Sequence, residues 1–365
     1  MPRRVVLHVD LDYFYAQCEE NLNPNLRGKP VVVCVYSGRT DESGVVSTCN
    51  YEARKYGVKA GIPIARAKKL LGTADASFRP TNRPHYAEVS DRIMETLETF
   101  GDTFEKVGID EVYLDLTSET NGDIYRAESI AREIKQKVLE QEKISCSVGV
   151  APNKLLAKIA SDLNKPNGLT VVRPENVRPF LGELSVDKIP GVGKKTEEKL
   201  DQLKVRTINQ LATHDVSVLH EIFGNALGTY LYRAARGEDE EPVEEREQPT
   251  QLSRIATLKR NTHDISEILP LLEDLANSAT EKLTEKAMTC KTVSILAILG
   301  DLSIHSKSRT LDSPTYDMRT IAQASKDLLE QFLQSEPTAA VRRVGVKLSG
   351  LLGRSGQTDI SKFLC

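Results

Sequence analysis

The alternation of apolar and polar positions over residues 1–172 predicts strands and helices in the order βαββαβ. Strand-like apolar runs lie at 4–10, 104–107, 111–116 and 144–150. Apolar residues recur at helical spacing between Tyr86 and Phe100 and again around Ile134. A Gly- and Pro-punctuated insertion up to about residue 82 interrupts this order and holds one more strand-like run, PVVVCVY. With the insertion set aside, the order predicts a ferredoxin-like, split βαβ fold of the α+β class.

The same order of elements returns in residues 253–350. Four strand-like runs, RIATLKR, TVSILAIL, 307–311 and VRRVGVKL, are separated by two helical patterns, and residues 173–237 between the two regions indicate short helices. Because 365 residues exceed the size of one compact core, we expect several domains.

The composition is typical of a soluble protein, with 28% charged and 39% apolar residues. No run of eighteen apolar residues occurs, and the N-terminal MPRR lacks the apolar region of a signal peptide. We therefore expect a cytoplasmic protein with no membrane partner, and a monomer. The six cysteines lack CxxC spacing, so we expect reduced, mostly buried thiols rather than zinc ligands or disulfides.

Excess acidity is concentrated in one short segment, residues 238–248, which holds seven acidic residues and one basic residue in a chain of net charge −3. Gly237, Pro242 and Pro249 punctuate it, and it has almost no apolar content. The segment is predicted to be an exposed interdomain linker. The rest of the chain is slightly basic.

Two acidic clusters interrupt the predicted strands of the first region. Asp10 and Asp12 follow the first strand, and Asp110 and Glu111 lie in the middle hairpin. In the ferredoxin-like order the first strand lies beside this hairpin, so Asp10 is expected next to Asp110 and Glu111. Because buried carboxylates need a cation or donor partner, the cluster predicts a site for a hard divalent metal.

Two further features point to phosphates. The segment IPGVGKKTEEKL resembles a helix-hairpin-helix motif, in which Gly191 and Gly193 let backbone N–H groups approach a phosphate and Lys194 and Lys195 add positive charge; the alternative is an ordinary Gly-rich turn. The strands of the second βαββαβ region carry basic residues that either follow nucleic-acid phosphates or form a solvated face. They include Arg254, Lys259, Arg260, Lys307, Arg309, Arg342, Arg343 and Lys347.

Five motifs in order resemble a Y-family DNA polymerase, most closely the DinB branch of archaeal lesion-bypass enzymes, over essentially the whole chain. They are VDLDYFYAQCE, STCNYEARKYGVKAGIP, IDEVYLDL, SVGVAPNKLLAKIASDLNKPNG and IPGVGKKT. The resemblance implies a right-hand polymerase with a palm at 1–13 and 83–172, fingers at 14–82, a thumb at 173–237, the acidic linker at 238–248, a little finger at 249–353 and a tail at 354–365.

The resemblance also implies template-directed addition of dNTPs to the 3′-hydroxyl of primed DNA, with low fidelity and no proofreading. Two Mg²⁺ ions, with Mn²⁺ as a substitute, would be held by Asp10, Asp110, Glu111 and the Leu11 carbonyl. Asp12 and Asp115 have another interpretation, as partners for a strand or neighbouring loop.

By the same resemblance, Thr48, Tyr51, Arg54 and Lys165 contact the incoming triphosphate. Tyr15 stands at the position of the steric gate that clashes with a ribose 2′-hydroxyl, although aromatic residues here would otherwise be taken as core. Ser47 would sit over the templating base. Two departures from the family pattern are Gly108, where a serine is usual, and the acidic rather than basic linker.

The tail QTDISKFL fits the spacing of a peptide that binds the ring-shaped sliding clamp, through Gln357, Ile360, Phe363 and Leu364. The alternative is a frayed amphipathic terminus. Two other classes compete for the whole chain. A nucleotidyl cyclase would have no use for the hairpin motif or the second βαββαβ domain, and a non-catalytic DNA-binding scaffold would tolerate the loss of Asp10 or Glu111.

Overall fold

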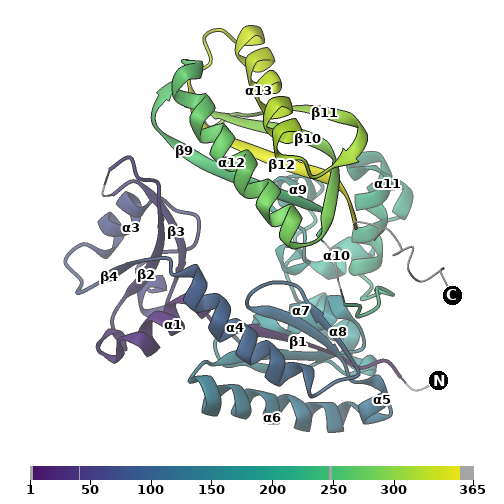
Figure 1. Cartoon of the computed structure of the whole chain (residues 1–365). Helices are drawn as coiled ribbons and strands as arrows, with labels where there is room; N and C mark the ends of the chain where they lie inside the picture. Colours follow the sequence, from purple (N-terminus) through teal and green to yellow (C-terminus); the bar gives the residue numbers. More distant parts are fainter. Residues whose placement is uncertain (1–2, 41, 246–248, 354–365) are drawn as a thin grey trace, which may run out of the picture. The chain divides into compact units, whose positions relative to one another are not determined.

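The computed structural model describes residues 3–40, 42–245 and 249–353 (Figure 1). The chain divides into two compact units. The described residues of the first lie within Met1–Cys34, Val46–Ile62 and Arg66–Arg246, and those of the second within Val35–Val45, Pro63–Ala65 and Glu247–Cys365.

A five-stranded sheet forms the centre of the first unit, in the order β5-β6-β1-β7-β8. Its strands are β1 (Val6–Leu11), β5 (Thr103–Lys106), β6 (Glu111–Asp115), β7 (Cys146–Ala151) and β8 (Leu169–Val171). The first four strands have the predicted ferredoxin-like order, and β1 pairs antiparallel with both β6 and β7. The predicted neighbourhood of the first strand and the middle hairpin is therefore confirmed. The fifth strand, β8, was not predicted; it is three residues long and pairs with β7.

Helices cover both faces of this sheet, which explains why every residue of β1 is buried. One face packs against α4 (Arg83–Glu98) and α6 (Ile124–Glu142), with Leu7 and Val9 of β1 in the same core. The other face packs against α7 (Lys154–Leu163), with Val6 of β1 in a second core. A short helix, α5 (Thr117–Thr120), follows β6.

The insertion after β1 forms a three-stranded sheet in the order β3-β2-β4. Its elements are α1 (Phe14–Leu22), β2 (Val31–Tyr36), β3 (Gly44–Cys49), α2 (Tyr51–Arg54), α3 (Ile64–Leu71) and β4 (Ser77–Pro80), with a 3-10 turn at Pro24–Leu26. Only β2 was predicted, because β3 and β4 lack continuous apolar runs.

Helices follow β8; three of them are short, as the sequence indicated, and the last is longer, with 19 residues. They are α8 (Val177–Gly182), α9 (Lys194–Gln202), α10 (Ile208–Ala212) and α11 (Val216–Ala234), with 3-10 turns at Pro174–Asn176 and Val186–Lys188. Gly224, at φ 77°, interrupts the helical backbone inside α11.

The predicted acidic linker is exposed at most of its described positions, 238–245, and two of its residues depart from the expectation. Val243 is 6% exposed and belongs to the core under α7. The Asp239 carboxylate accepts the Leu155 N–H at 2.9 Å, at the positive N-terminal end of α7. Lys154 donates to the Pro242 carbonyl at 3.2 Å. The linker contacts the first unit here because the start of α7 offers backbone N–H groups and a buried lysine. The linker sequence alone does not reveal these partners.

The second unit contains the second βαββαβ order, with strands in the order β11-β10-β12-β9. Its elements are β9 (Gln251–Thr262), α12 (Ile265–Glu285), β10 (Met288–Leu299), β11 (Ile304–Thr315), α13 (Met318–Ser335) and β12 (Val341–Gly353). Both helices share one core with the sheet. The strands are longer than the predicted runs, since exposed polar residues at their ends continue the antiparallel ladder.

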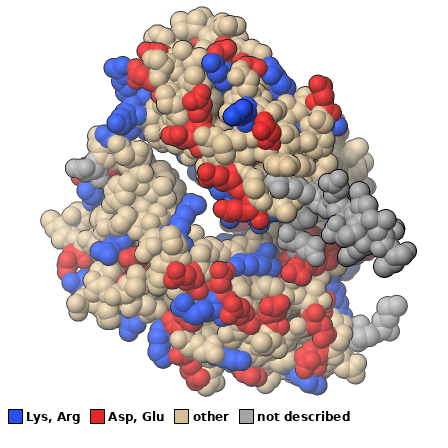
Figure 2. All heavy atoms as spheres, viewed as in Figure 1, with Lys and Arg blue, Asp and Glu red and all other residues tan. Residues whose placement is uncertain are grey.

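Two expectations from composition can be checked in the described part of the chain. Cys18, Cys34, Cys49, Cys146 and Cys290 are all buried free thiols, which confirms that prediction for these five. No helix within 3–40, 42–245 and 249–353 is long and apolar enough to cross a membrane. Acidic and basic side chains are interspersed over the visible surface (Figure 2).

Candidate active site

One cavity of about 390 Å³ in the first unit collects the side chains that the sequence singled out. Its lining comes from the end of β1, the start of α1, the β3–α2 segment, the β5–β6 hairpin and the loop after α7. The lining residues are Asp10, Leu11, Tyr13, Phe14, Tyr15, Ser47, Thr48, Tyr51, Arg54, Ile109, Asp110 and Lys165. The cavity thus contains the proposed triphosphate contacts, the steric gate, Ser47 and two of the three carboxylates.

Strand pairing sets the positions of the carboxylates. Asp10 lies opposite Glu111 in the β1–β6 register, and the Leu11 N–H donates to the Asp110 carbonyl at 2.9 Å. Lysines neutralise two of the three: Lys165 Nζ lies 2.6 Å from Asp10 Oδ2, and Lys158 Nζ lies 2.8 Å from Glu111 Oε2. Among the described residues, no group of three His, Cys, Asp or Glu side chains is arranged to hold a metal.

The electrostatics of the site favour a cation. Burial raises the pKa of Asp10 to about 7, against the opposing effect of Lys165. Burial and the neighbouring Glu111 raise the pKa of Asp110. The pKa of Glu111 is far below its usual range because His8 and Lys158 face it. Ionising Asp10 and Asp110 therefore requires compensating positive charge, and carboxylate and carbonyl oxygens are the donors that Mg²⁺ prefers. The donor set fits that metal.

The Tyr15 ring is held by a group of buried side chains. It stacks on Tyr86 with ring centroids 4.4 Å apart and an interplanar angle of 18°. Tyr86 is fully buried, and its hydroxyl donates to Glu19 at 2.7 Å; Arg79 pairs with the same carboxylate at 3.0 Å. The Tyr15 ring at the cavity wall is thus backed by fixed side chains.

The cavity lining also includes Tyr51 and Arg54 of the short helix α2. Asn50 caps this helix by accepting the Ala53 N–H at 3.0 Å. The Arg54 guanidinium lies 4.5 Å from the centre of the Tyr51 ring, and its Nε donates to the Cys49 carbonyl at 3.2 Å. Arg54 is exposed, so its remaining N–H groups are available to an anion.

Asp12 and Asp115, the two acidic residues outside the proposed metal site, both accept hydrogen bonds from neighbouring segments. Asp115 accepts the Thr117 N–H at 2.8 Å. Asp12 is 1% exposed and accepts hydrogen bonds from two serines of the β7 segment and from the loop after α7.

The backbone at Gly108 leaves ordinary space for a side chain, since a Cβ there would lie 3.6 Å from Asp110 Oδ1. A serine would fit, so no steric requirement explains this departure.

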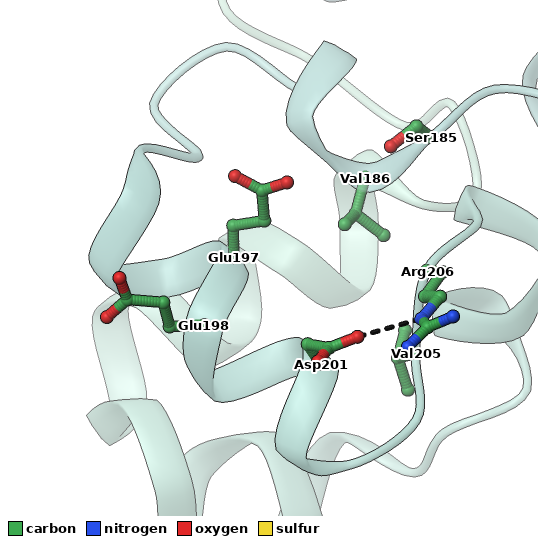
Figure 3. Close-up of a pocket in the computed structure, with 7 residues that line it drawn as sticks. All are labelled: Ser185, Val186, Glu197, Glu198, Asp201, Val205 and Arg206. Carbon is green, nitrogen blue, oxygen red and sulfur yellow. Dashed lines mark hydrogen bonds and ion pairs between the residues drawn. The ribbon is translucent and has the colours of Figure 1, made fainter.

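The hairpin motif precedes α9. Gly191 has φ +84°, a conformation that favours glycine, and Gly193 is the residue before the first turn. Lys194 and Lys195 are exposed on that turn. A different part of α9 lines an acidic pocket with Glu197, Glu198 and Asp201, the last paired with Arg206 at 2.8 Å (Figure 3). Those carboxylates would repel phosphates, so only the Gly-Lys end of α9 is suited to DNA.

Four of the basic residues of the second unit bond to the covering helices. Arg254 donates to Ser278 of α12 at 3.3 Å, and Lys307 donates to the Gln331 carbonyl of α13 at 3.3 Å. Arg260 donates to Glu267 of α12 at 3.0 Å, and Arg309 donates to Asp327 of α13 at 2.8 Å. Lys259 is exposed, and Arg342 and Arg343 lie half-buried on β12. The proposed clamp contacts, Gln357, Ile360, Phe363 and Leu364, lie outside the described residues.

Sequence reasoning missed Tyr86, His8 and Lys158. The Ser161 hydroxyl donates to the Lys158 carbonyl at 2.8 Å, and Ser161 Oγ also shares a hydrogen bond of 2.7 Å with His8 Nδ1. This chain of contacts connects β1 to the turn of α7 that carries Lys158. The only signal in the sequence was that Lys158 stands two helical turns before Lys165 in NKLLAKIASDLNK.

Comparison with known proteins gives matches over nearly the whole chain. Three family models match: the impB/mucB/samB family at residues 9–162, its C-terminal domain at 249–361, and the thumb domain of DNA polymerase-iota at 187–239. The chain is 45% identical to DNA polymerase IV of Nitrosopumilus maritimus and 44% identical to that of Methanosarcina acetivorans, with 100% of each chain covered in both cases.

Solved structures give the same result. A Y-family DNA polymerase chimera matches with a TM-score of 0.90 and 42% identity, covering 96% of this chain and 99% of the other. An insertion ternary complex of Dbh DNA polymerase matches with a TM-score of 0.69 at the same identity and coverage.

Proposed function

The chain belongs to the Y family of DNA polymerases, and from this membership we propose that Asp10, Asp110, Glu111 and the Leu11 carbonyl hold two Mg²⁺ ions for dNTP addition to a primer. It is a DNA-directed DNA polymerase of the error-prone, translesion type. The observation that carries the proposal is one cavity whose lining brings the buried Asp10 and the half-buried Asp110 together with Lys165, Arg54 and the Tyr15 ring.

The bound metal would supply activation of the primer 3′-hydroxyl and neutralisation of the leaving pyrophosphate. The protein's own residues perform the remaining tasks. Arg54 and Lys165 bind the triphosphate oxygens by charge-assisted hydrogen bonds. Thr48 and Tyr51 add hydroxyl contacts, and Tyr15, backed by Tyr86, excludes a ribose 2′-hydroxyl.

Primed DNA is the proposed partner. Relatives of this chain include insertion ternary and post-insertion binary complexes of Dbh DNA polymerase. The Gly191 to Lys195 turn and the basic residues Lys259, Arg342 and Arg343 would bind DNA phosphates. Arg260 and Arg309 could contribute only after releasing their acidic partners on α12 and α13.

The domain assignment and the clamp peptide are part of the proposal. We assign the palm to 1–13 and 83–172, the fingers to 14–82, the thumb to 173–237 and the little finger to 249–353. The tail at 354–365 would bind a sliding clamp. The matches to thumb and C-terminal domain models at 187–239 and 249–361 support the division.

The first test is primer extension with dNTPs and Mg²⁺. The wild type should extend the primer, and Asp110→Ala should lose extension, because it removes a carboxylate from the cavity. Asp115→Asn is the matched control: this residue ends β6, the strand that begins directly after Asp110, it bonds Thr117 and it is absent from the cavity lining. It should keep wild-type extension.

Two results would overturn the assignment. Equal extension by Asp110→Ala and the wild type would remove Asp110 from the metal site. DNA binding without extension, even by the wild type, would support the non-catalytic scaffold.

A further inference from the structure

Asp12 is a buried carboxylate that the proposed chemistry does not use. It lies two residues after Asp10 and is only 1% exposed. Three donors converge on it: Ser145 Oγ at 2.8 Å and the Asn167 N–H at 2.8 Å on Oδ2, and Ser147 Oγ at 2.7 Å on Oδ1. Burying a charge is costly without such partners, so the arrangement is a built network.

The network joins three segments that are far apart in the sequence. Asp12 follows β1, the two serines lie at the start of β7, and Asn167 lies in the loop after α7. Ser147 Oγ also accepts the Gly168 N–H at 3.0 Å, so two consecutive backbone N–H groups of this loop are held by the network. Lys135 of α6 adds a third restraint by donating to Asn167 Oδ1 at 2.7 Å.

The loop carries Lys165, whose side chain reaches the active-site cavity. Lys165 Nζ lies 2.6 Å from Asp10 Oδ2 and 2.6 Å from Asp162 Oδ1. A lysine side chain has about 2 kcal/mol of rotamer entropy, so its reach depends on where its backbone is fixed. Asp12 is a buried carboxylate that bonds this backbone two residues after Lys165.

We propose that Asp12 is a positioning residue: by holding Asn167 it places Lys165 where it binds the incoming triphosphate. This inference rests on the proposed role of Lys165. It predicts that replacing Asp12 lowers the affinity for dNTP, and that this loss requires the Lys165 side chain.

The test is a double-mutant cycle of dNTP affinity, with Asp12→Ala, Lys165→Ala and the double variant. Binding of a correct dNTP is titrated onto the complex with a primer-template whose primer ends in a dideoxynucleotide, so affinity is read without chemistry. Asp12→Ala should weaken binding by roughly tenfold, a coupling of ordinary size for residues in one network. The double variant should bind no more weakly than Lys165→Ala.

Asp12→Asn is the conservative variant. Its amide oxygen can still accept from Ser145 and Asn167, while its amide nitrogen donates to the Ser147 oxygen. It should recover most of the affinity that Asp12→Ala loses. If Asp12→Ala does not fold, Ser147→Ala takes its place in the cycle, because it removes one bond to Asp12 and one to Gly168.

Two outcomes would overturn the inference. In the first, the double variant loses dNTP affinity by the product of the two single-variant factors, so the residues act independently. In the second, Asp12→Ala binds dNTP as tightly as the wild type. Failure of the proposed function gives a different pattern, namely no primer extension by the wild type. Unchanged dNTP affinity in Lys165→Ala would remove the premise and with it this role for Asp12.

Discussion

At the residue scale, the role of a side chain depends on what holds it. Tyr15 is half-buried, and by residue type alone it would be taken as a core aromatic. The stacked Tyr86 ring and the Tyr86–Glu19 hydrogen bond instead fix it at the cavity wall. Lys158 and Lys165 similarly reach Glu111 and Asp10 because α7 and its following loop place them there.

Replacement of Tyr15 tests the steric gate. Tyr15→Ala opens the wall where a ribose 2′-hydroxyl would lie, so the preference for dNTP over rNTP should fall by about tenfold or more. The ratio of kcat/KM for the two nucleotides measures this. Tyr15→Phe keeps the ring and should keep the preference. Unchanged discrimination in Tyr15→Ala would remove the residue from this role.

His8 should make stability depend on pH. Burial lowers its pKa below the ordinary value, although Glu111 opposes this effect. At His8 the unfolded chain takes up a proton near pH 6.5, while the folded chain resists it, so the His8 contribution to the free energy of unfolding should fall as pH drops through that value. Asp10, whose pKa burial raises to about 7, acts in the opposite direction in each of the proteins compared. Urea unfolding at pH 7.5 and 5.5 measures the loss.

His8→Phe should have a smaller loss of stability between the two pH values than the wild type, because the buried titrating group is gone. His263→Gln, at an exposed position, is the control and should behave as the wild type does. An equal loss in His8→Phe and the wild type would assign the pH dependence to other groups.

At the element scale, α7 connects the sheet to the site. Asn153 caps its N-terminus by accepting the Leu156 N–H at 2.9 Å, and the linker carboxylate Asp239 bonds the same turn. The helix lies close to β7 because Gly149 has no side chain: a Cβ there would lie 2.0 Å from the Ala157 carbonyl oxygen and 2.6 Å from the Ser161 N.

Gly149→Ala should therefore force α7 away from the sheet. Overpacking of this kind costs about 1–3 kcal/mol of folding stability, and dNTP affinity should fall as well because Lys165 moves with the helix. Gly182→Ala is the control, since its Cβ would meet Asn209 at an ordinary 3.7 Å. Denaturant unfolding compares the two. Equal stability of the two variants would contradict this account of the close contact.

At the scale of the whole molecule, each unit has a hydrophobic core built from its own strands and helices. Residues 238–245 belong to the first unit: Asp239 accepts a hydrogen bond from Leu155, and Val243 packs into a core of that unit. The proposed clamp peptide lies beyond β12, after the last described residue, so it can be removed without cutting either core.

Deletion of residues 356–365 should leave basal primer extension intact and abolish its stimulation by the sliding clamp. Full-length Phe363→Ala should show the same loss, because the aromatic anchor of the peptide is missing. Thr358→Ala, at a spacer position, is the matched control. Stimulation that persists after the deletion would contradict the tail hypothesis.

The sequence by itself determined the βαββαβ order of both regions and, through it, the pairing of Asp10 with Glu111. It could do so because the period of apolar residues is a local property, and strand order in this fold follows from element order. The motifs also identified the cavity residues Tyr15, Tyr51, Arg54 and Lys165, since each stands at a fixed position within a contiguous motif.

Only the tertiary structure decided which side chains support these residues. Tyr86 behind Tyr15, the Lys158–Glu111 pair, the docking of Val243 under α7 and the attachment of Arg260 and Arg309 to helices all join segments distant in sequence. Such contacts depend on how faces meet after folding, and periodicity along the chain carries no information about that. The Asp12 network has the same origin, because three separate segments must converge before its carboxylate is satisfied.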